Sequence, residues 1–267
     1  MPLISSTRQE ACPAYAPDGR KIAFFSDRSG AYELWVCNSD GSNPTQLTSC
    51  GGIDNGPRWS PDGRTIAITV SPGRYQYIYV ISANGGVPRR LTSDPAVEDK
   101  WPYWSRDGQW IYFSRGGLAG GPATNQIWKV PATGGKAVQI TPNGEVREMP
   151  QESPDGKFLY YKKYTAYSCS VWRMPVGGGE EARVITSVHP PGGHRVREQG
   201  IYFFRAPDGQ GHSDICFYEF ATGKTRKILT IERPIGFYIE VSPDGRTILY
   251  NQVDQVGSDL MLVENFR

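Results

Sequence analysis

The strongest constraint on this chain is a tetrad that recurs along its whole length. The tetrad, Ser/Ala-Pro/Arg-Asp-Gly, begins at Ala16, Ser60, Ser105, Ser153 and Ser242. A degenerate copy, Glu198-Gln199-Gly200, stands where a further tetrad is expected. The third residues fall at 18, 62, 107, 155, 199 and 244, which gives steps of 44, 45, 48, 44 and 45 residues. A repeat of this period with strand-rich content is typical of a β-propeller that has one blade per repeat.

Each repeat has the same internal order of apolar runs and turns. An apolar run follows the Asp-Gly turn, as at 21–25, and a second run follows it, as at 34–36. These short β-branched and aromatic runs, bounded by Gly and Pro, predict buried strands. A Gly-bearing turn such as Asp40-Gly41 leads to a short outer run, as at 46–48, and the innermost strand precedes the tetrad, as at 57–60. The pattern predicts four antiparallel strands per blade.

The two ends of the chain together supply one complete blade. The sixth repeat stops at Arg267 after its third run, whereas Leu3-Ile4-Ser5-Ser6 matches an outer strand such as 47–49. We therefore expect the N-terminal strand to join the last blade and close the ring, which leaves no long exposed sheet edge. The predicted fold class is all-β, a six-bladed β-propeller. Five blades with a flanking appendage is the alternative, because the fifth repeat has lost its Asp.

The length and composition of residues 1–267 fit a single domain. Because both ends of the chain fall at the point where the ring closes, we expect a domain excised from a longer protein. A net charge of +2 does not indicate a nucleic-acid surface. No run of 18 apolar residues is present, so we expect no membrane contact by this domain. We also expect the domain to be a monomer. The compartment stays open, and is periplasmic if the parent is a membrane-anchored regulator. Five cysteines form no disulfide framework, and Cys37 and Cys216 are expected in the core.

Repeated residues are expected to maintain the repeat. The Asp of each tetrad should accept backbone hydrogen bonds in its own turn, and Trp35, Trp128 and Trp172 should pack in blade cores. The chain has no Gly-x-Ser-x-Gly elbow, no His-Glu-x-x-His and no phosphate-binding Gly-Lys-Ser/Thr. Its three histidines, His189, His194 and His212, supply no convincing metal site. We expect no enzyme activity and no cofactor, with calcium in the axial channel left open because oxygen ligands suffice.

The predicted binding site is a funnel on the face opposite the Asp-Gly turns, where the loops differ most between blades. It includes the longest loop, 115–125, which is either a lid or a tolerated insertion. The candidate ligand-binding residues are Asp54, Asp99, Lys100, Trp101, Arg147, Glu148, His194 and Arg195. Acids in early blades facing bases in later ones suit a zwitterionic or peptide-like ligand, with Trp101 as the apolar anchor. The alternative is a solvated rim without a ligand.

The segments SPDGRTIAI and APDGRKIAFFSDRSGAYELWVCNSDGSNPTQLTS resemble the TolB-type propeller repeat, a relative of the WD-type repeat. The resemblance covers essentially the whole chain and implies the fold, not one function. TolB is a periplasmic protein-interaction propeller. Similar blades form the gating propeller of prolyl oligopeptidases and the C-terminal sensor-like part of bacterial winged-helix, CadC-like regulators. The run VWRMPVGGGEEARVI at 171–185 resembles the last group most.

Two classes of function follow. The favoured one is a non-enzymatic binding or scaffold propeller, whose partner is a protein, a peptide or a small polar ligand, within a larger bacterial regulator. The alternative is a substrate-gating or catalytic propeller of a hydrolase or lyase.

Overall fold

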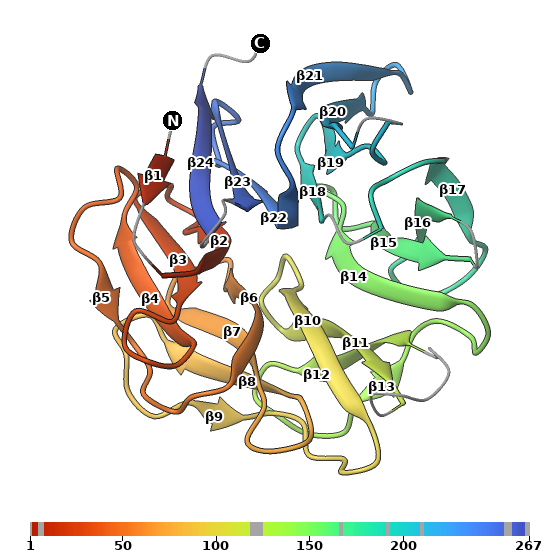
Figure 1. The fold of residues 1–267 in the computed structure, drawn as a ribbon. Coiled ribbons are helices and arrows are strands. Elements are labelled where there is room, and N and C mark those ends of the chain that lie inside the picture. Colours follow the sequence, from red (N-terminus) through yellow and green to blue (C-terminus); the bar gives the residue numbers. More distant parts are fainter. Residues whose placement is uncertain are drawn as a thin grey trace.

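A computed structural model describes residues 2–4, 8–117, 125–165, 168–190, 193–208, 211–253 and 258–264. Within these ranges, 24 strands form six antiparallel sheets of four strands each, and no helix is found. The sheets stand around a central axis as propeller blades, with the first strand of each blade nearest the axis (Figure 1). The predicted fold class, a six-bladed β-propeller, is confirmed.

The strands of the first three blades are β2 (Glu10–Tyr15), β3 (Lys21–Ser26), β4 (Glu33–Asn38) and β5 (Thr45–Gln46); β6 (Ile53–Trp59), β7 (Thr65–Val70), β8 (Tyr77–Ser82) and β9 (Arg89–Arg90); and β10 (Glu98–Trp104), β11 (Trp110–Gly116), β12 (Gln126–Pro131) and β13 (Val138–Gln139). The fourth and fifth blades contain β14 (Val146–Glu152), β15 (Phe158–Tyr164), β16 (Cys169–Pro175) and β17 (Ala182–Ile185); and β18 (His194–Arg197), β19 (Gly200–Phe204), β20 (Ser213–Glu219) and β21 (Thr225–Ile231). The sixth blade contains β22 (Ile235–Val241), β23 (Thr247–Val253), β24 (Ser258–Glu264) and β1 (Pro2–Ile4).

The N-terminal strand closes the ring, as the sequence predicts. β1 pairs antiparallel with β24, with Pro2 opposite Met261 and Ile4 opposite Leu260. Ile4 is buried in a cluster that includes Phe24 of the first blade and Leu249 of the sixth. The two ends of the chain therefore build one sheet, visible where β1 lies beside β24 in Figure 1. The predicted strand also included Ser5 and Ser6, which lie outside the described residues.

Each tetrad forms a hydrogen-bonded turn between the first two strands of its blade, and the same turn recurs from blade to blade. In the second blade, Ser60 Oγ donates to Asp62 Oδ1 at 2.5 Å, and the same carboxylate oxygen accepts from the Arg64 backbone N–H at 3.0 Å. These hydrogen bonds hold the pKa of the Asp62 carboxyl below its usual range. Gly63 has φ +70°, a left-handed conformation that glycine adopts at little cost. The predicted turn role of Asp is thus confirmed, and the equivalent Ser-to-Asp bond recurs at Ser105, Ser153 and Ser242.

The third and fifth tetrads depart from the repeat, and each departure has its own physical reason. In the third blade the backbone N–H of Arg106 donates to Glu152 Oε2 at 2.8 Å, a bond that a proline could not make. In the fifth blade the turn shrinks to Glu198-Gln199, because Arg197 pairs directly with Gly200. Arg197 therefore occupies the strand position where the second blade has Ser60, at the end of an inner strand.

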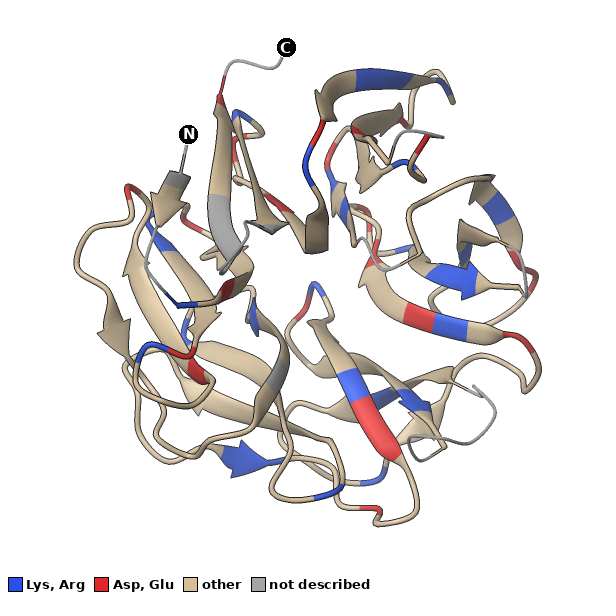
Figure 2. Cartoon of the chain, viewed as in Figure 1, with Lys and Arg blue, Asp and Glu red and all other residues tan. Residues whose placement is uncertain are grey.

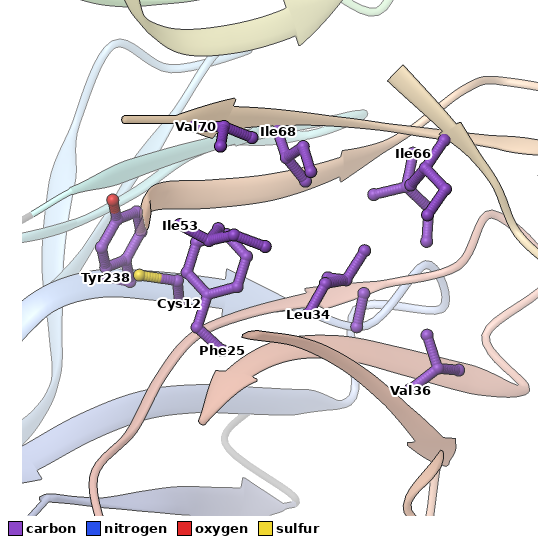
Figure 3. Close-up of a cluster of buried hydrophobic side chains, with 11 residues drawn as sticks. Cys12, Phe25, Leu34, Val36, Ile53, Ile66, Ile68, Val70 and Tyr238 are labelled. Carbon is purple, nitrogen blue, oxygen red and sulfur yellow. The ribbon is translucent and has the colours of Figure 1, made fainter. Parts of the chain in front are cut away.

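Apolar side chains fill the spaces between blades. The cluster in Figure 3 joins Phe25 and Leu34 of the first blade to Ile66 and Ile68 of the second, with Tyr238 arriving from the sixth. Cys37 and Cys216 are buried, as predicted, and Cys12 and Cys169 are buried as well. Burial of such side chains is the main favourable contribution to folding, so the interfaces between blades hold the ring together.

Candidate functional site

One register position on the inner strands carries side chains that vary between blades. Arg58 is paired with Ala67 on the next strand, and the same register selects one residue in every blade. We call this set the axial ring: Ala14, Arg58, Tyr103, Gln151, Arg195 and Glu240. Five of the six are polar, and only arginine occurs twice, so the ring is asymmetric although the surrounding frame repeats.

Contacts between non-adjacent blades show that side chains of the axial ring reach the centre of the propeller. The Arg195 guanidinium of the fifth blade lies 5.6 Å from the ring centroid of Tyr103 in the third. The Arg58 guanidinium of the second blade lies 6.0 Å from the ring centroid of Tyr238 in the sixth. Because these blades are not neighbours around the ring, their side chains can meet only near its centre.

Glu240 holds two of the arginines. Arg195 Nε donates to Glu240 Oε1 at 2.8 Å, and Arg197 Nη2 donates to the same oxygen. Arg197 Nε also donates to the Val241 carbonyl at 3.1 Å. Burial, and then the nearby charge of Arg195, lower the pKa of Arg197 to about 10, and the same two causes lower the pKa of Arg58. The guanidiniums of Arg58 and Arg195 therefore repel each other across the axis.

A cavity of about 400 Å³ opens from the axial ring toward the tetrad turns. Its wall includes Arg58, Tyr103 and Arg195 of the ring, and the tetrad prolines Pro17 and Pro61 stand at its edge. Trp59 and Trp104 also line it, and each is fixed by a hydrogen bond to the preceding blade: Trp59 Nε1 donates to the Ala14 carbonyl at 3.0 Å and Trp104 Nε1 to the Arg58 carbonyl at 2.9 Å. The cavity is thus lined by aromatic faces and guanidiniums on a rigid frame.

Beyond the ring, on the side away from the tetrads, aromatic side chains fill the axis. The rings of Trp101 and Tyr238, from the opposite third and sixth blades, lie 5.6 Å apart between centroids. Cys12 packs in the same cluster, as Figure 3 shows beside Tyr238. Cys12, Trp101 and Met149 each precede a proline and have φ of +59°, +58° and +57°. Each lies at a register shift in its inner strand, so a β-bulge re-aims its side chain.

Asp99, expected in a ligand-binding funnel, is instead fully buried. Arg115 Nε and Nη2 donate to its two carboxylate oxygens at 2.7 and 2.8 Å. The same guanidinium lies 4.8 Å from the ring of Trp128. The pair therefore lies against a half-buried tryptophan that packs on the blade core, and removing either charged partner would cost about 3 to 5 kcal/mol.

The equivalent position in other blades plays the same structural role. In the first blade Glu10 pairs with Arg28 at 2.6 Å, and Arg28 lies over Trp35. In the fourth blade the charge is reversed: Arg147 Nε and Nη2 donate to Glu181 at 2.6 and 3.0 Å. Burial raises the pKa of Glu181, but hydrogen bonds from Arg147, Tyr161 and Lys163 outweigh it and hold the value at about 2. Figure 2 shows both signs side by side on β10 and on β14.

The remaining candidate residues lie on or beside the inner strands, and one of them, Arg195, reaches the axis. Lys100 pairs with Glu98 at 2.7 Å, and Glu148 accepts a hydrogen bond from Asn125. His194 is buried, and burial lowers its pKa to about 3. Asp54 belongs to β6, and its side chain lies outside the described part of the structure. Of the eight candidates, Arg195 lines the axial cavity; ligand binding by the set stays a prediction. Most of loop 115–125 also lies outside the described residues.

Sequence reasoning missed Arg58, Tyr103 and Glu240. A usable signal was present: each axial-ring residue stands two places before the first residue of its tetrad, or before Arg197 in the fifth blade. Comparing that one column between repeats selects the ring without a structure.

These features define a six-bladed propeller whose axis is filled on one side and hollow on the tetrad side. Residues 3–193 match the TolB beta propeller domain family, and the chain belongs to that family. Within the described residues, no helix is long and apolar enough to cross a membrane, and no cluster of three or more His, Cys, Asp or Glu could hold a metal ion.

Solved structures with several functions share the fold. TolB from Acinetobacter baumannii matches with a TM-score of 0.72 and 19% identity, over 96% of this chain and 61% of that protein. A TolB-type protein from Agrobacterium tumefaciens matches with a TM-score of 0.70 and 18% identity, over 98% and 92%. An oligogalacturonate lyase from Vibrio parahaemolyticus matches with a TM-score of 0.66 and 11% identity, over 98% and 92%. At these identities the likeness establishes the fold, and this chain spans 61% of the length of the Acinetobacter protein.

Proposed function

We propose that this domain is a non-enzymatic binding propeller that holds its ligand in the axial cavity at the tetrad end. The observation that carries the proposal is the axial ring, where side chains differ between blades on a frame that repeats. A cavity of about 400 Å³ lies within the usual size of ligand pockets. Aromatic walls with a few convergent polar groups are also typical of such pockets.

The surroundings of the thiol and carboxyl groups near the axis support a binding role over a catalytic one. Burial raises the pKa of Cys12 to about 12, which makes its thiol a poor nucleophile at neutral pH. Glu152 accepts hydrogen bonds from Tyr112 Oη at 2.7 Å and from the Arg106 backbone, and Glu240 accepts from two arginines. These carboxylates are therefore engaged as hydrogen-bond acceptors within the protein, which suits anchoring rather than proton transfer.

The occupant is a small polar ligand or a side chain of a partner peptide inserted at the tetrad face. Membership of the TolB propeller family and similarity to TolB structures support a binding role. The run at 171–185 supports the narrower proposal of a sensing domain within a CadC-like bacterial regulator. Similarity to an oligogalacturonate lyase and to a prolyl endopeptidase propeller supports the alternative, a catalytic or gating propeller.

The test is a thermal-shift screen of amino acids, short peptides, sugars, nucleotides and organic acids. A ligand at 100 times its dissociation constant stabilises a protein by about 2.7 kcal/mol, enough for a clear rise in Tm. The shift should vanish in Tyr103→Ala, which removes a cavity wall, and persist in Tyr75→Ala, a half-buried tyrosine on the other face. Mass spectrometry should recover the ligand unchanged after incubation. A shift that survives Tyr103→Ala would contradict the cavity, and product formation would contradict the non-enzymatic role.

A further inference from the structure

The axial cavity carries a positive charge that the protein leaves unmatched. Its lining contains four arginines and two glutamates, and Glu240 beneath it bonds to two of those arginines. Four positive and three negative groups leave a surplus of one positive charge. The arginines are Arg58, Arg106, Arg195 and Arg197, and the carboxylates are Glu152, Glu198 and Glu240.

The surplus lies at the axis and not at the surface. Arg106 pairs with Glu198 at 3.4 Å at the exposed mouth, while Arg195 and Arg197 share Glu240. Arg58 donates Nη1 to the Pro57 carbonyl at 2.8 Å, and no carboxylate of the described residues pairs with it. Arg195 is 7% exposed, and its Nη1 has no hydrogen-bond partner among the described residues.

Such an arrangement is unfavourable without an anion. Two guanidiniums approach from the opposite second and fifth blades, and a like charge in a partly desolvated site costs free energy. An unpartnered buried donor adds a further cost, because the hydrogen bonds that it lost with water are not replaced. An anion between the guanidiniums would remove both costs, because charge-assisted hydrogen bonds to arginine are strong and often bidentate.

Resting on the proposed binding function, we infer that the axial cavity binds the carboxylate of a small organic acid between Arg58 and Arg195. One surplus charge matches a monoanion, whereas a phosphate dianion would leave a charge unbalanced. Tyr103, Trp59 and Trp104 offer flat apolar faces to the body of the acid. The same guanidinium geometry would bind phosphate, so the charge count is what selects the carboxylate.

The experiment uses acetate, benzoate and inorganic phosphate as probes, against chloride at equal ionic strength. Calorimetry and thermal unfolding are compared for the natural chain, Arg58→Met and Arg20→Met. Arg58→Met orphans no carboxylate, so it should fold with equal or higher Tm without anion. Its dissociation constant for benzoate should rise about tenfold or more, as expected for loss of a charged hydrogen bond. Arg20→Met removes an exposed charge of the same sign on the tetrad side, outside the cavity lining, and should bind benzoate as the natural chain does.

Benzoate binding tighter than phosphate, and lost in Arg58→Met alone, supports the inference. Tighter phosphate binding overturns the carboxylate assignment. Equal benzoate binding by Arg58→Met, or no binding of any probe, overturns the site. A neutral ligand that requires Tyr103 but not Arg58 would sustain the proposed function and overturn this inference, so the two failures are distinguishable.

Discussion

At the scale of single residues, buried charge in this protein mainly holds the strands of one blade together. Arg115 joins the buried carboxylate of Asp99 to the face of Trp128, and Arg28 does the same for Glu10 and Trp35. Sequence position alone places Asp99 in a polar loop region and cannot show its burial. Its partner is 16 residues away across a hairpin, and only strand register reveals that the two meet.

His194 is expected to make stability depend on pH. Its buried imidazole has a pKa of about 3, against about 6.5 in an unfolded chain. Between these values the unfolded state binds more protons, so the free energy of unfolding falls as pH falls from about 6.5 toward 3. His194→Leu should remove about 3 kcal/mol of that loss between pH 7 and 4. Urea unfolding across this range measures it.

The same variant should be no less stable than the natural chain at pH 7, because neither ring nitrogen of His194 has a partner among the described residues. His212→Leu, on a partly exposed loop, is the matched control for loss of an imidazole, and its pH profile is measured alongside. An unaltered slope in His194→Leu would show that another group titrates.

At the scale of elements, the hairpins were predictable and the bulges were not. Asp-Gly turns and β-branched runs are local signals, so strands such as β7 and β8 follow from sequence alone. Trp101 and Met149 adopt left-handed backbone before proline, although neither residue type favours that conformation. The Trp101 side chain packs at the axis against Tyr238 of the sixth blade, a contact that no window of sequence contains.

Arg106→Pro tests whether the irregular tetrad has a structural cause. Proline suits the other tetrads, but here it would remove the N–H that bonds Glu152, at a cost of about 1 to 2 kcal/mol. Arg106→Ala keeps that N–H and loses only an exposed ion pair with Glu198, so it should cost less than about 0.5 kcal/mol. Chemical denaturation compares the two. Greater stability of the proline variant would contradict the role of this bond.

At the scale of the whole molecule, the number of blades decides which residues face each other. The period predicted six blades and ring closure from sequence. The electrostatic repulsion between Arg58 and Arg195 could not be predicted in this way. It depends on the inward direction of one strand position and on the opposition of the second and fifth blades. For that reason the fold was accessible from the repeat, whereas the axial cavity was found only in the assembled ring.

Ring closure gives a direct test. Deleting residues 1–7 removes β1, exposes the edge of β24 and uncovers the cluster around Ile4. We expect a loss of several kcal/mol, a large part of the usual stability of a domain. Thermal unfolding and size-exclusion chromatography should show a lower Tm and more aggregation. A full-length Ile4→Asp chain should be destabilised in the same direction, and an unchanged Tm in both would contradict closure by β1.

The axial ring also bears on how such a protein can diversify. A duplicated blade inherits the tetrad, the hairpins and the core, because these contacts are made within the blade or with its immediate neighbours. The residue at the ring contacts other blades across the axis, as Tyr103 and Arg195 do. Each copy can therefore change this one residue while its own architecture is preserved. Substitutions in this column could give relatives of one ancestor different ligands, with bonded pairs such as Arg195 and Glu240 changing together.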